Sequence, residues 1–339
     1  MISRWASLLF LTLATLAACG SQPAAAVPSV TSASPAAAGS AAGAADAGGS
    51  VTVYGALTQD GGNAFASDFE VSHPGTKVNM VVGGTGVLLS RIAAEQKAGG
   101  VKADILLLAD PTAMAGFISN GLLADYQPKD AGQLPSSMRG QGWNGAFTFN
   151  NVILYRNSVA IPPKDWPDLN NPLYKGAIEI GDPSASGTSL SMFYVLSNKF
   201  GVDYFRTLRA LDARVVASTA TVGTDIAGGQ MQVGISLDSV GRDMAKKGSP
   251  VQMVWPASGT IAVPAPLAIV KGRDSAGARS FADWLISPAG QAEAVKLGYA
   301  PAYGRSDAIP AGTKVLDVDF DQLQKDRDKT LESFSSIFS

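Results

Sequence analysis

Residues 78–100 read VNMVVGGTGVLLSRIAAEQKAGG: a short apolar run, a glycine-rich turn and then a helical pattern. A buried strand followed by a polar turn and a helix is the repeating unit of a parallel α/β sheet. The same order occurs on both sides of this stretch, with expected strands VTVYGA at 51–56 and DILLLA at 104–109, each followed by a helical segment. The sequence therefore predicts an α/β unit here.

A second α/β series follows the long strand expected at 147–159. Two such series joined by long strands predict two lobes with a cleft between them, where ligands bind at the carboxyl ends of strands. We expect the first lobe over 51–150, the second over 151–264, and a return to the first lobe with C-terminal helices over 265–339. Within these parts the pattern predicts a strand at 214–219, a helix at 224–231 and one terminal helix at 319–338.

The N-terminal segment MISRWASLLFLTLATLAACG carries one arginine, an apolar stretch and then small residues, so 1–18 are expected to be a signal peptide. LAAC at 16–19 resembles a bacterial lipobox, in which Cys19 is lipidated; the alternative is an ordinary signal peptide with an incidental cysteine. Residues 20–50 are rich in Ala, Gly, Ser and Pro, which predicts a flexible tether after the lipidated cysteine, over 19–50. We expect an extracytoplasmic protein anchored to the cell membrane through Cys19.

Composition disfavours several classes of function. The formal net charge of the 339 residues is −2 and there is no long basic run, so nucleic acid is an improbable partner. The sole histidine, His73, precedes Pro74 in an expected loop, and no Ser–His–Asp arrangement can be built without it. With a single cysteine there is no His/Cys spacing typical of a metal site either. We expect no enzymatic activity, no metal site and no cofactor.

Hydroxyls and glycines gather where strands pass into helices. Residues 181–193 read GDPSASGTSLSMF, and GGTG at 83–86 has the same construction. The first N–H groups of a helix lack internal partners and favour negative charge, so such turns suit a phosphate, phosphonate or carboxylate. The alternative is a plain helix cap in a serine-rich loop. The candidate anion-binding residues are Tyr54, Thr58, Gly84, Thr85, Gly86, Thr112, Ser184, Ser186, Gly187, Thr188, Ser189 and Asp238.

Four longer stretches resemble the extracellular solute-binding proteins of ABC importers, in the cluster that binds iron(III), phosphonates or sugar phosphates. They are GGTGVLLSRIAAEQ (83–96), ADILLLADPTAMAGFISNGLLADYQP (103–128), WPDLNNPLYKGAIEIGDPSASGTS (166–189) and FADWLISPAGQAEAVKLGYAP (281–301). The resemblance implies the α/β fold of type II periplasmic binding proteins, with two Rossmann-like lobes, a hinge and an interlobe cleft. It also implies closure on a small anionic solute and delivery to an ABC permease.

The resemblance also implies where iron ligands would stand. Ferric members of this cluster carry adjacent tyrosines after a strand that here reads QVGISLDSVG (232–241), with Leu237 and Asp238 in their place. Only Tyr54 remains at a ligand-like position, and one phenol with Asp238 is a poor ligand set for ferric ion, so iron is the alternative to an organic anion. Asp238 either pairs with an amine or hydroxyl of an organic anion or caps the following helix.

The aromatic residues Phe149, Trp143 and Trp255 line the cleft or belong to the core. A surface lipoprotein with an interaction or sensory role is a further alternative.

Overall fold

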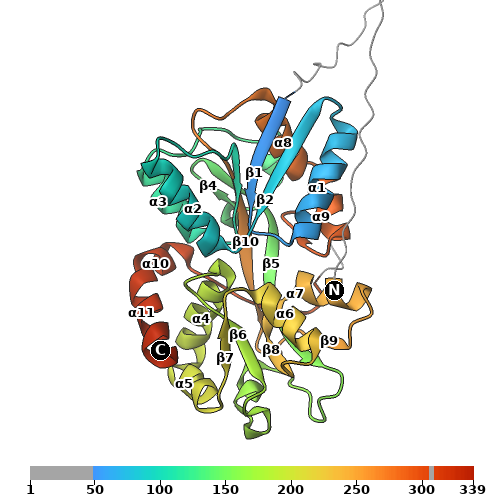
Figure 1. Ribbon diagram of the computed structural model, residues 1–339, viewed down its shortest axis with the longest axis vertical. Coiled ribbons are helices and arrows are strands. Elements are labelled where there is room, and N and C mark those ends of the chain that lie inside the picture. The colour runs from blue at the N-terminus through green and yellow to red at the C-terminus, as the bar shows by residue number, and fades with distance from the viewer. Residues whose placement is uncertain (1–48, 305–308) are drawn as a thin grey trace, which may run out of the picture. The chain divides into compact units, whose positions relative to one another are not determined.

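A mixed β-sheet runs through the computed structural model, which describes residues 49–304 and 309–339 (Figure 1). Its main path places the strands in the order β2, β1, β3, β10, β5, β8, β6, β7. The predicted signal peptide, Cys19 and nearly all of the predicted tether lie outside the described residues.

The first lobe contains the strand, turn and helix predicted at 78–100. β1 pairs in parallel with β2 on one side and with β3 on the other, as expected of strands connected through helices. The elements are β1 (Gly49–Gly55), α1 (Gln59–Ser72), β2 (Thr76–Val82), α2 (Thr85–Lys97), β3 (Ile105–Leu107), α3 (Thr112–Ser119) and β4 (Arg139–Gly140). Short 3-10 helices η1 (Ala131–Gln133) and η2 (Ser136–Met138) follow α3.

The second lobe repeats this arrangement around β6, which pairs in parallel with β7 and β8. Its elements are η3 (Trp166–Asn170), η4 (Pro172–Tyr174), β6 (Ile178–Gly181), α4 (Gly187–Phe200), α5 (Asp203–Ala210), β7 (Arg214–Val216), α6 (Thr219–Gly228), β8 (Val233–Leu237), α7 (Asp238–Lys246) and β9 (Val251–Val254). The prediction that a strand extends over 214–219 and a helix begins at 224 is wrong, because the Ser218 side chain caps α6 and ends the extended segment.

Two long antiparallel strands join the lobes. They are β5 (Trp143–Arg156) and β10 (Thr260–Ile269). β10 pairs with β3 through Leu267–Ile269, whereas β5 pairs with β8 through Asn151–Tyr155. β10 therefore extends the sheet of the first lobe and β5 that of the second, and the two strands also pair with each other. Figure 1 shows both strands crossing between the halves. This confirms the predicted fold class of two α/β lobes connected by hinge strands.

The C-terminal segment contacts both lobes. It contains α8 (Ala276–Ile286), α9 (Pro288–Lys296), β11 (Ala300–Pro301), β12 (Val315–Leu316), α10 (Phe320–Lys325) and α11 (Arg327–Phe338). α8 contacts β1, α9 contacts α1 and α10 contacts α3, whereas α11 packs against α4 and α5. The single helix predicted at 319–338 is wrong: Asp326 has φ −91° and ψ 5°, so it ends α10 and precedes α11.

Candidate functional site

A pocket of about 160 Å³ lies where helices of both lobes begin. We call it the inner pocket. Its floor includes Phe149 on the hinge strand β5 and Leu237 at the end of β8. The lining residues are Ala56, Leu57, Thr58, Val82, Gly83, Gly84, Thr85, Ala109, Phe149, Ser186, Thr188, Ser218, Thr219, Ala220, Leu237, Ser239, Val240 and Tyr299.

The N-terminal ends of α1, α2, α4 and α6 meet at the inner pocket. Their N-cap residues are Thr58, Gly84, Ser186 and Ser218, and all of them line it. Because the first turns of a helix present N–H groups and the positive end of the helix dipole, this arrangement favours an anion. No Lys, Arg, Asp or Glu occurs among the described residues that line the pocket. Electrostatic attraction here would come from backbone amides and hydroxyls.

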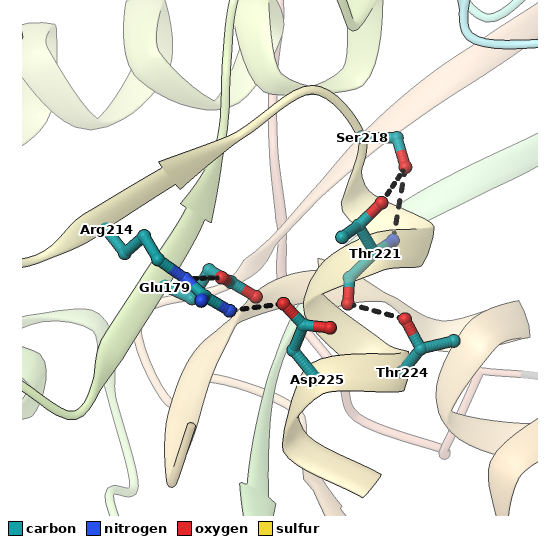
Figure 2. Close-up of polar contacts among 6 residues, drawn as sticks. All are labelled: Glu179, Arg214, Ser218, Thr221, Thr224 and Asp225. Carbon is teal, nitrogen blue, oxygen red and sulfur yellow. Dashed lines mark hydrogen bonds and ion pairs between the residues drawn. The ribbon is translucent and has the colours of Figure 1, made fainter. Parts of the chain in front are cut away.

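The hydroxyls of this pocket take part in helix caps. Ser186 Oγ accepts a hydrogen bond of 3.4 Å from the Ser189 amide and lies 3.0 Å from Thr188 Oγ1. Ser218 Oγ likewise accepts from the Thr221 amide at 3.1 Å (Figure 2). A hydroxyl that accepts from a backbone amide still has a proton to donate. Capping and ligand binding are therefore compatible at Ser186 and Ser218.

Several predicted residues thus line the same pocket, namely Thr58, Gly84, Thr85, Ser186 and Thr188. They come from opposite lobes, with Thr85 in α2 and Thr188 in α4. Both of these threonines are buried. This is the placement that the strand-to-helix turns predict, and the assignment of these residues to a ligand stays a prediction.

Gly86 and Gly187 have a different role from the expected one. The Gly86 amide donates a 2.9 Å hydrogen bond to the carbonyl of Ala185, across the lobes. A Cβ at Gly86 would lie 2.8 Å from Ala185 Cα, and one at Gly187 would lie 2.4 Å from the carbonyl oxygen of Ala109. The group that approaches each glycine is therefore the backbone of the other lobe, so these glycines allow the lobes to meet.

Ser184 and Ser189 do not line the inner pocket. Ser184 is exposed, and its amide donates to Asp182 Oδ1 at 2.7 Å. Ser189 is buried with its hydroxyl towards β6, since a Cβ at Gly181 would lie 2.3 Å from Ser189 Oγ. Ser189 Oγ has no hydrogen-bond partner among the described residues. Thr188 and Ser189 are consecutive residues of α4, so their side chains point in different directions: Thr188 lines the inner pocket, whereas Ser189 faces β6.

Tyr54 is held against α2 rather than in the pocket. Its hydroxyl donates to Glu95 Oε1 at 2.6 Å and accepts from Arg91 Nε at 2.9 Å. The Arg91 guanidinium also lies 4.8 Å from the centre of the Tyr54 ring. Burial, followed by the hydrogen bond to Glu95, raises the pKa of the phenol. Tyr54 therefore anchors α2 to β1 and is a poor metal ligand.

Thr112 and Asp238 also belong to buried polar networks. Thr112 Oγ1 donates to Asp110 Oδ1 at 2.5 Å and accepts from Arg327 Nη1 at 2.6 Å. Arg327, at the start of α11, also bonds Asp110 Oδ2 at 2.7 Å. These contacts attach the C-terminal helix to the turn between β3 and α3.

Asp238 lies behind the pocket, where it joins the hinge to α7. Its carboxylate accepts from the amide and the side chain of Asn150, at 3.1 and 3.0 Å, and pairs with Arg242. Burial raises the pKa of Asp238 to about 6, although Arg242 and Asn150 act to lower it. Asp238 does not line the inner pocket, and the N-cap of α7 is Leu237 with no side-chain cap, so the carboxylate binds the hinge strand and Arg242.

Sequence reasoning missed Tyr299, Ser218, Thr219 and Ser239. Tyr299 reaches the pocket because β11 pairs with β5, which stacks its ring on Phe147 at 4.4 Å between centroids. No local pattern marks that contact. Ser218 could have been recognised, because a serine that follows an apolar stretch and precedes a helix is a typical N-cap.

A family model for bacterial extracellular solute-binding proteins matches residues 51–300. The chain belongs to this family. The protein is similar to a probable ABC transporter periplasmic-binding protein of Sinorhizobium fredii, with 26% identity over 261 residues, 70% of this chain and 68% of the relative. It is also similar to the phosphoglycerate transport regulatory protein PgtC of Salmonella typhimurium, with 26% identity over 200 residues, 56% of this chain and 50% of the relative.

Solved structures of solute-binding proteins share the fold. The periplasmic binding protein AfuA of Actinobacillus pleuropneumoniae, with fructose-6-phosphate bound, has a TM-score of 0.76 at 23% identity, covering 85% of this chain and 98% of AfuA. Iron-bound HitA of Pseudomonas aeruginosa has a TM-score of 0.71 at 19% identity, covering 85% of this chain and 99% of HitA. These likenesses show the fold. Membership of the extracellular solute-binding family, with the similarity to an ABC transporter periplasmic-binding protein, implies a small-molecule ligand and a membrane permease as partners.

An ion-pair cluster joins three elements of the second lobe in this solute-binding protein. Figure 2 shows the Arg214 guanidinium between the carboxylates of Glu179 and Asp225. Arg214 Nε lies 2.5 Å from Glu179 Oε1. Burial raises the pKa of Glu179. Because Glu179 lies in β6 and Asp225 in α6, Arg214 on β7 joins the strand that precedes Ser186 to the helix that Ser218 caps.

In residues 49–304 and 309–339, no three His, Cys, Asp or Glu side chains are grouped so that they could hold a metal ion. Every helix in the same ranges is too short or too polar to span a bilayer.

Proposed function

We propose that this solute-binding protein captures a small organic anion, such as an organic phosphate or phosphonate, between its lobes and delivers it unchanged to an ABC permease. The observation that carries the proposal is the meeting of four helix N-termini at the inner pocket. Backbone amides at these positions bind oxyanions without any cationic side chain. The pocket's hydroxyls, from Thr58, Thr85 and Thr188 among others, add further donors.

Two of the similar proteins support an anion carrying phosphate. PgtC is described as a phosphoglycerate transport regulatory protein, and the AfuA structure holds fructose-6-phosphate. The apolar lining from Leu57, Phe149 and Leu237 suits the carbon skeleton of an organic ligand better than a hydrated inorganic ion.

The proposal is tested by substituting Thr188, a buried hydroxyl in the pocket. Hydrogen bonds to a charged group contribute on the order of 1.5–3 kcal/mol, so Thr188→Val should weaken binding of the retained solute roughly ten- to a hundredfold. Thr207→Val, at an exposed site on α5, is the matched control. The solute is first identified by mass spectrometry after mild purification, and its affinity is then measured by calorimetry. Wild-type affinity in Thr188→Val would move the anion site elsewhere.

Ferric ion is the second candidate, because Tyr299 lines the inner pocket and iron-bound HitA shares the fold. Burial, with the nearby carboxylates of Asp238 and Asp243, raises the pKa of the Tyr299 phenol. A phenol that resists ionisation is a weak ferric ligand. Ferric citrate should therefore produce no tyrosinate charge-transfer band, and a strong band that disappears in Tyr299→Phe would favour iron over the organic anion.

We also propose that Cys19 is lipidated and anchors the protein to the outside of the cell membrane. The support is the LAAC sequence at 16–19 and the absence of any other cysteine in the chain. A single acyl group gives weak membrane binding, whereas two or more anchor a protein stably. The tether over 20–50 would then leave the lobes free to reach a permease.

A further inference from the structure

A second hollow adjoins the inner pocket on the side of α1 and α7. This outer chamber has a volume of about 280 Å³. It shares Thr58, Ala220, Ser239, Val240 and Tyr299 with the lining of the inner pocket. Its other lining residues are Gln59, Asp60, Gly61, Thr224, Asp243, Met244, Lys246, Lys247 and Leu297. A solute held in the inner pocket can therefore extend into the outer chamber.

The outer chamber differs from the inner pocket in its charged side chains. Lys247 Nζ lies 2.8 Å from Asp243 Oδ2 and 3.2 Å from Asp60 Oδ2. Asp60 belongs to α1 in the first lobe, whereas Asp243 belongs to α7 in the second. The hydrogen bonds to Asp243 and Asp60 raise the pKa of Lys247, which keeps the ammonium charged. The chamber therefore offers strong acceptors and a strong donor side by side.

We propose that the outer chamber is a second subsite, which binds the hydroxyl-bearing part of an organic phosphate or phosphonate while the anionic group occupies the inner pocket. This inference rests on the proposed function of the inner pocket. Asp60 and Asp243 accept hydrogen bonds from two ligand hydroxyls, and Lys247 donates to a third oxygen. Such charge-assisted hydrogen bonds are roughly twice as strong as neutral ones.

The charged side chains of the outer chamber disfavour a ligand that places a second charged group there. Asp60 and Asp243 already share the ammonium of Lys247, and Lys246 adds a second positive charge, so the charges of the chamber balance and attract neither a second anionic group nor a ligand ammonium. A ligand ammonium would have to displace Lys247 from both carboxylates. The other lysine of the chamber, Lys246, donates to the carbonyl of Lys296 at 2.7 Å. Neutral hydroxyls can join the existing pairs, with Met244 and Leu297 against the carbon chain.

A pair of matched phosphate esters tests the subsite. Glycerol 3-phosphate and propyl phosphate have the same carbon chain and the same anionic group, and differ in two hydroxyls. Calorimetry should show that the wild-type protein binds glycerol 3-phosphate roughly ten- to a hundredfold more tightly than propyl phosphate. Equal affinities would overturn the subsite while leaving the anion site intact. If neither ester nor inorganic phosphate binds, the anion site fails, and the subsite fails with it.

Asp243→Asn then locates the preference in the outer chamber. It should abolish most of the preference for glycerol 3-phosphate and change propyl phosphate affinity less than twofold, whereas Thr188→Val should weaken both esters. Asp203→Asn, an exposed change on α5, is the control, and thermal unfolding verifies that each variant is folded. Equal loss for both esters in Asp243→Asn would refute the assignment. So would tighter binding of 3-aminopropyl phosphate than of glycerol 3-phosphate, because that result would assign the chamber to an ammonium group.

Discussion

Replacing Gly86 by alanine should lower solute affinity without weakening the fold. The new Cβ would lie 2.8 Å from Ala185 Cα and from the Ser184 carbonyl oxygen, whereas ordinary contacts begin at 3.4 Å. The lobes would have to separate by roughly half an ångström, which overpacks the contact at a cost of about 1–3 kcal/mol. Loss of the Gly86–Ala185 hydrogen bond adds about 0.5–1.5 kcal/mol.

These costs apply to the closed state, because the open lobes can avoid the collision without unfolding. A total of about 1.5–4.5 kcal/mol corresponds to a roughly 10- to 2000-fold rise in the dissociation constant. The unfolding free energy of the unliganded protein should rise slightly, since alanine in a helix is favoured over glycine by about 0.5–1 kcal/mol. Affinity and stability are thus expected to change in opposite directions.

Calorimetry with glycerol 3-phosphate and small-angle scattering with and without it measure the two effects of Gly86→Ala. The variant should bind weakly and stay extended at a concentration that compacts the wild type. Gly116→Ala is the matched control, because Gly116 lies in helix α3 with no atom within 4 Å of its would-be Cβ. Wild-type affinity and full compaction in Gly86→Ala would show that the contact with Ala185 does not belong to the solute-bound state.

Three further predictions concern stability and anchoring. Arg214→Met leaves the buried Glu179 without its cation, so the unfolding free energy in urea should fall by about 3 kcal/mol at pH 7 and by less as the pH is lowered, because burial raises the pKa of Glu179 and favours its protonation; a loss that does not change with pH would contradict this. Burial raises the pKa of Asp238 from 3.8 to about 6, so the folded protein keeps a proton that the unfolded chain releases. The stability of the wild type relative to Asp238→Asn should therefore fall as the pH rises from about 4 to 6, and a rise over that window would refute the burial argument. Cys19→Ala should move the protein from membranes into the soluble fraction, and unchanged membrane association would exclude lipid anchoring.

The fold could be predicted where local pattern and topology agree. The apolar run at 78–82 followed by GGTG predicts β2 and α2, and both are confirmed to within a few residues. The same reasoning placed Thr58, Thr85 and Thr188 near strand ends, where the structure brings them into one pocket. Helix caps and hydrophobic runs are local features, so a single sequence records them directly.

The remainder depends on contacts between distant segments. Gly86 and Gly187 read as sites of close approach, but the sequence does not say whether a solute or the other lobe does the approaching. Tyr299 enters the pocket through the pairing of β11 with β5, and Asp238 is drawn into a buried network with Asn150. The residues next to such side chains in the sequence do not indicate which distant groups they contact, which is why the sequence left Asp238 as either a ligand contact or, by preference, a helix cap.

The bonds from Arg327 to Asp110 and Thr112 connect the lobes in addition to the two hinge strands. A hinge made of two adjacent strands can bend, and it can also twist about the long axis of the strands. Because α11 packs on the second lobe while its first residue holds the first lobe, twisting would pull Arg327 away from a buried carboxylate. We therefore expect α11 to restrict twisting, so that the lobes open by bending of the hinge strands alone. The width of the mouth, and hence the largest solute admitted, would then depend on Arg327, which lines neither the inner pocket nor the outer chamber.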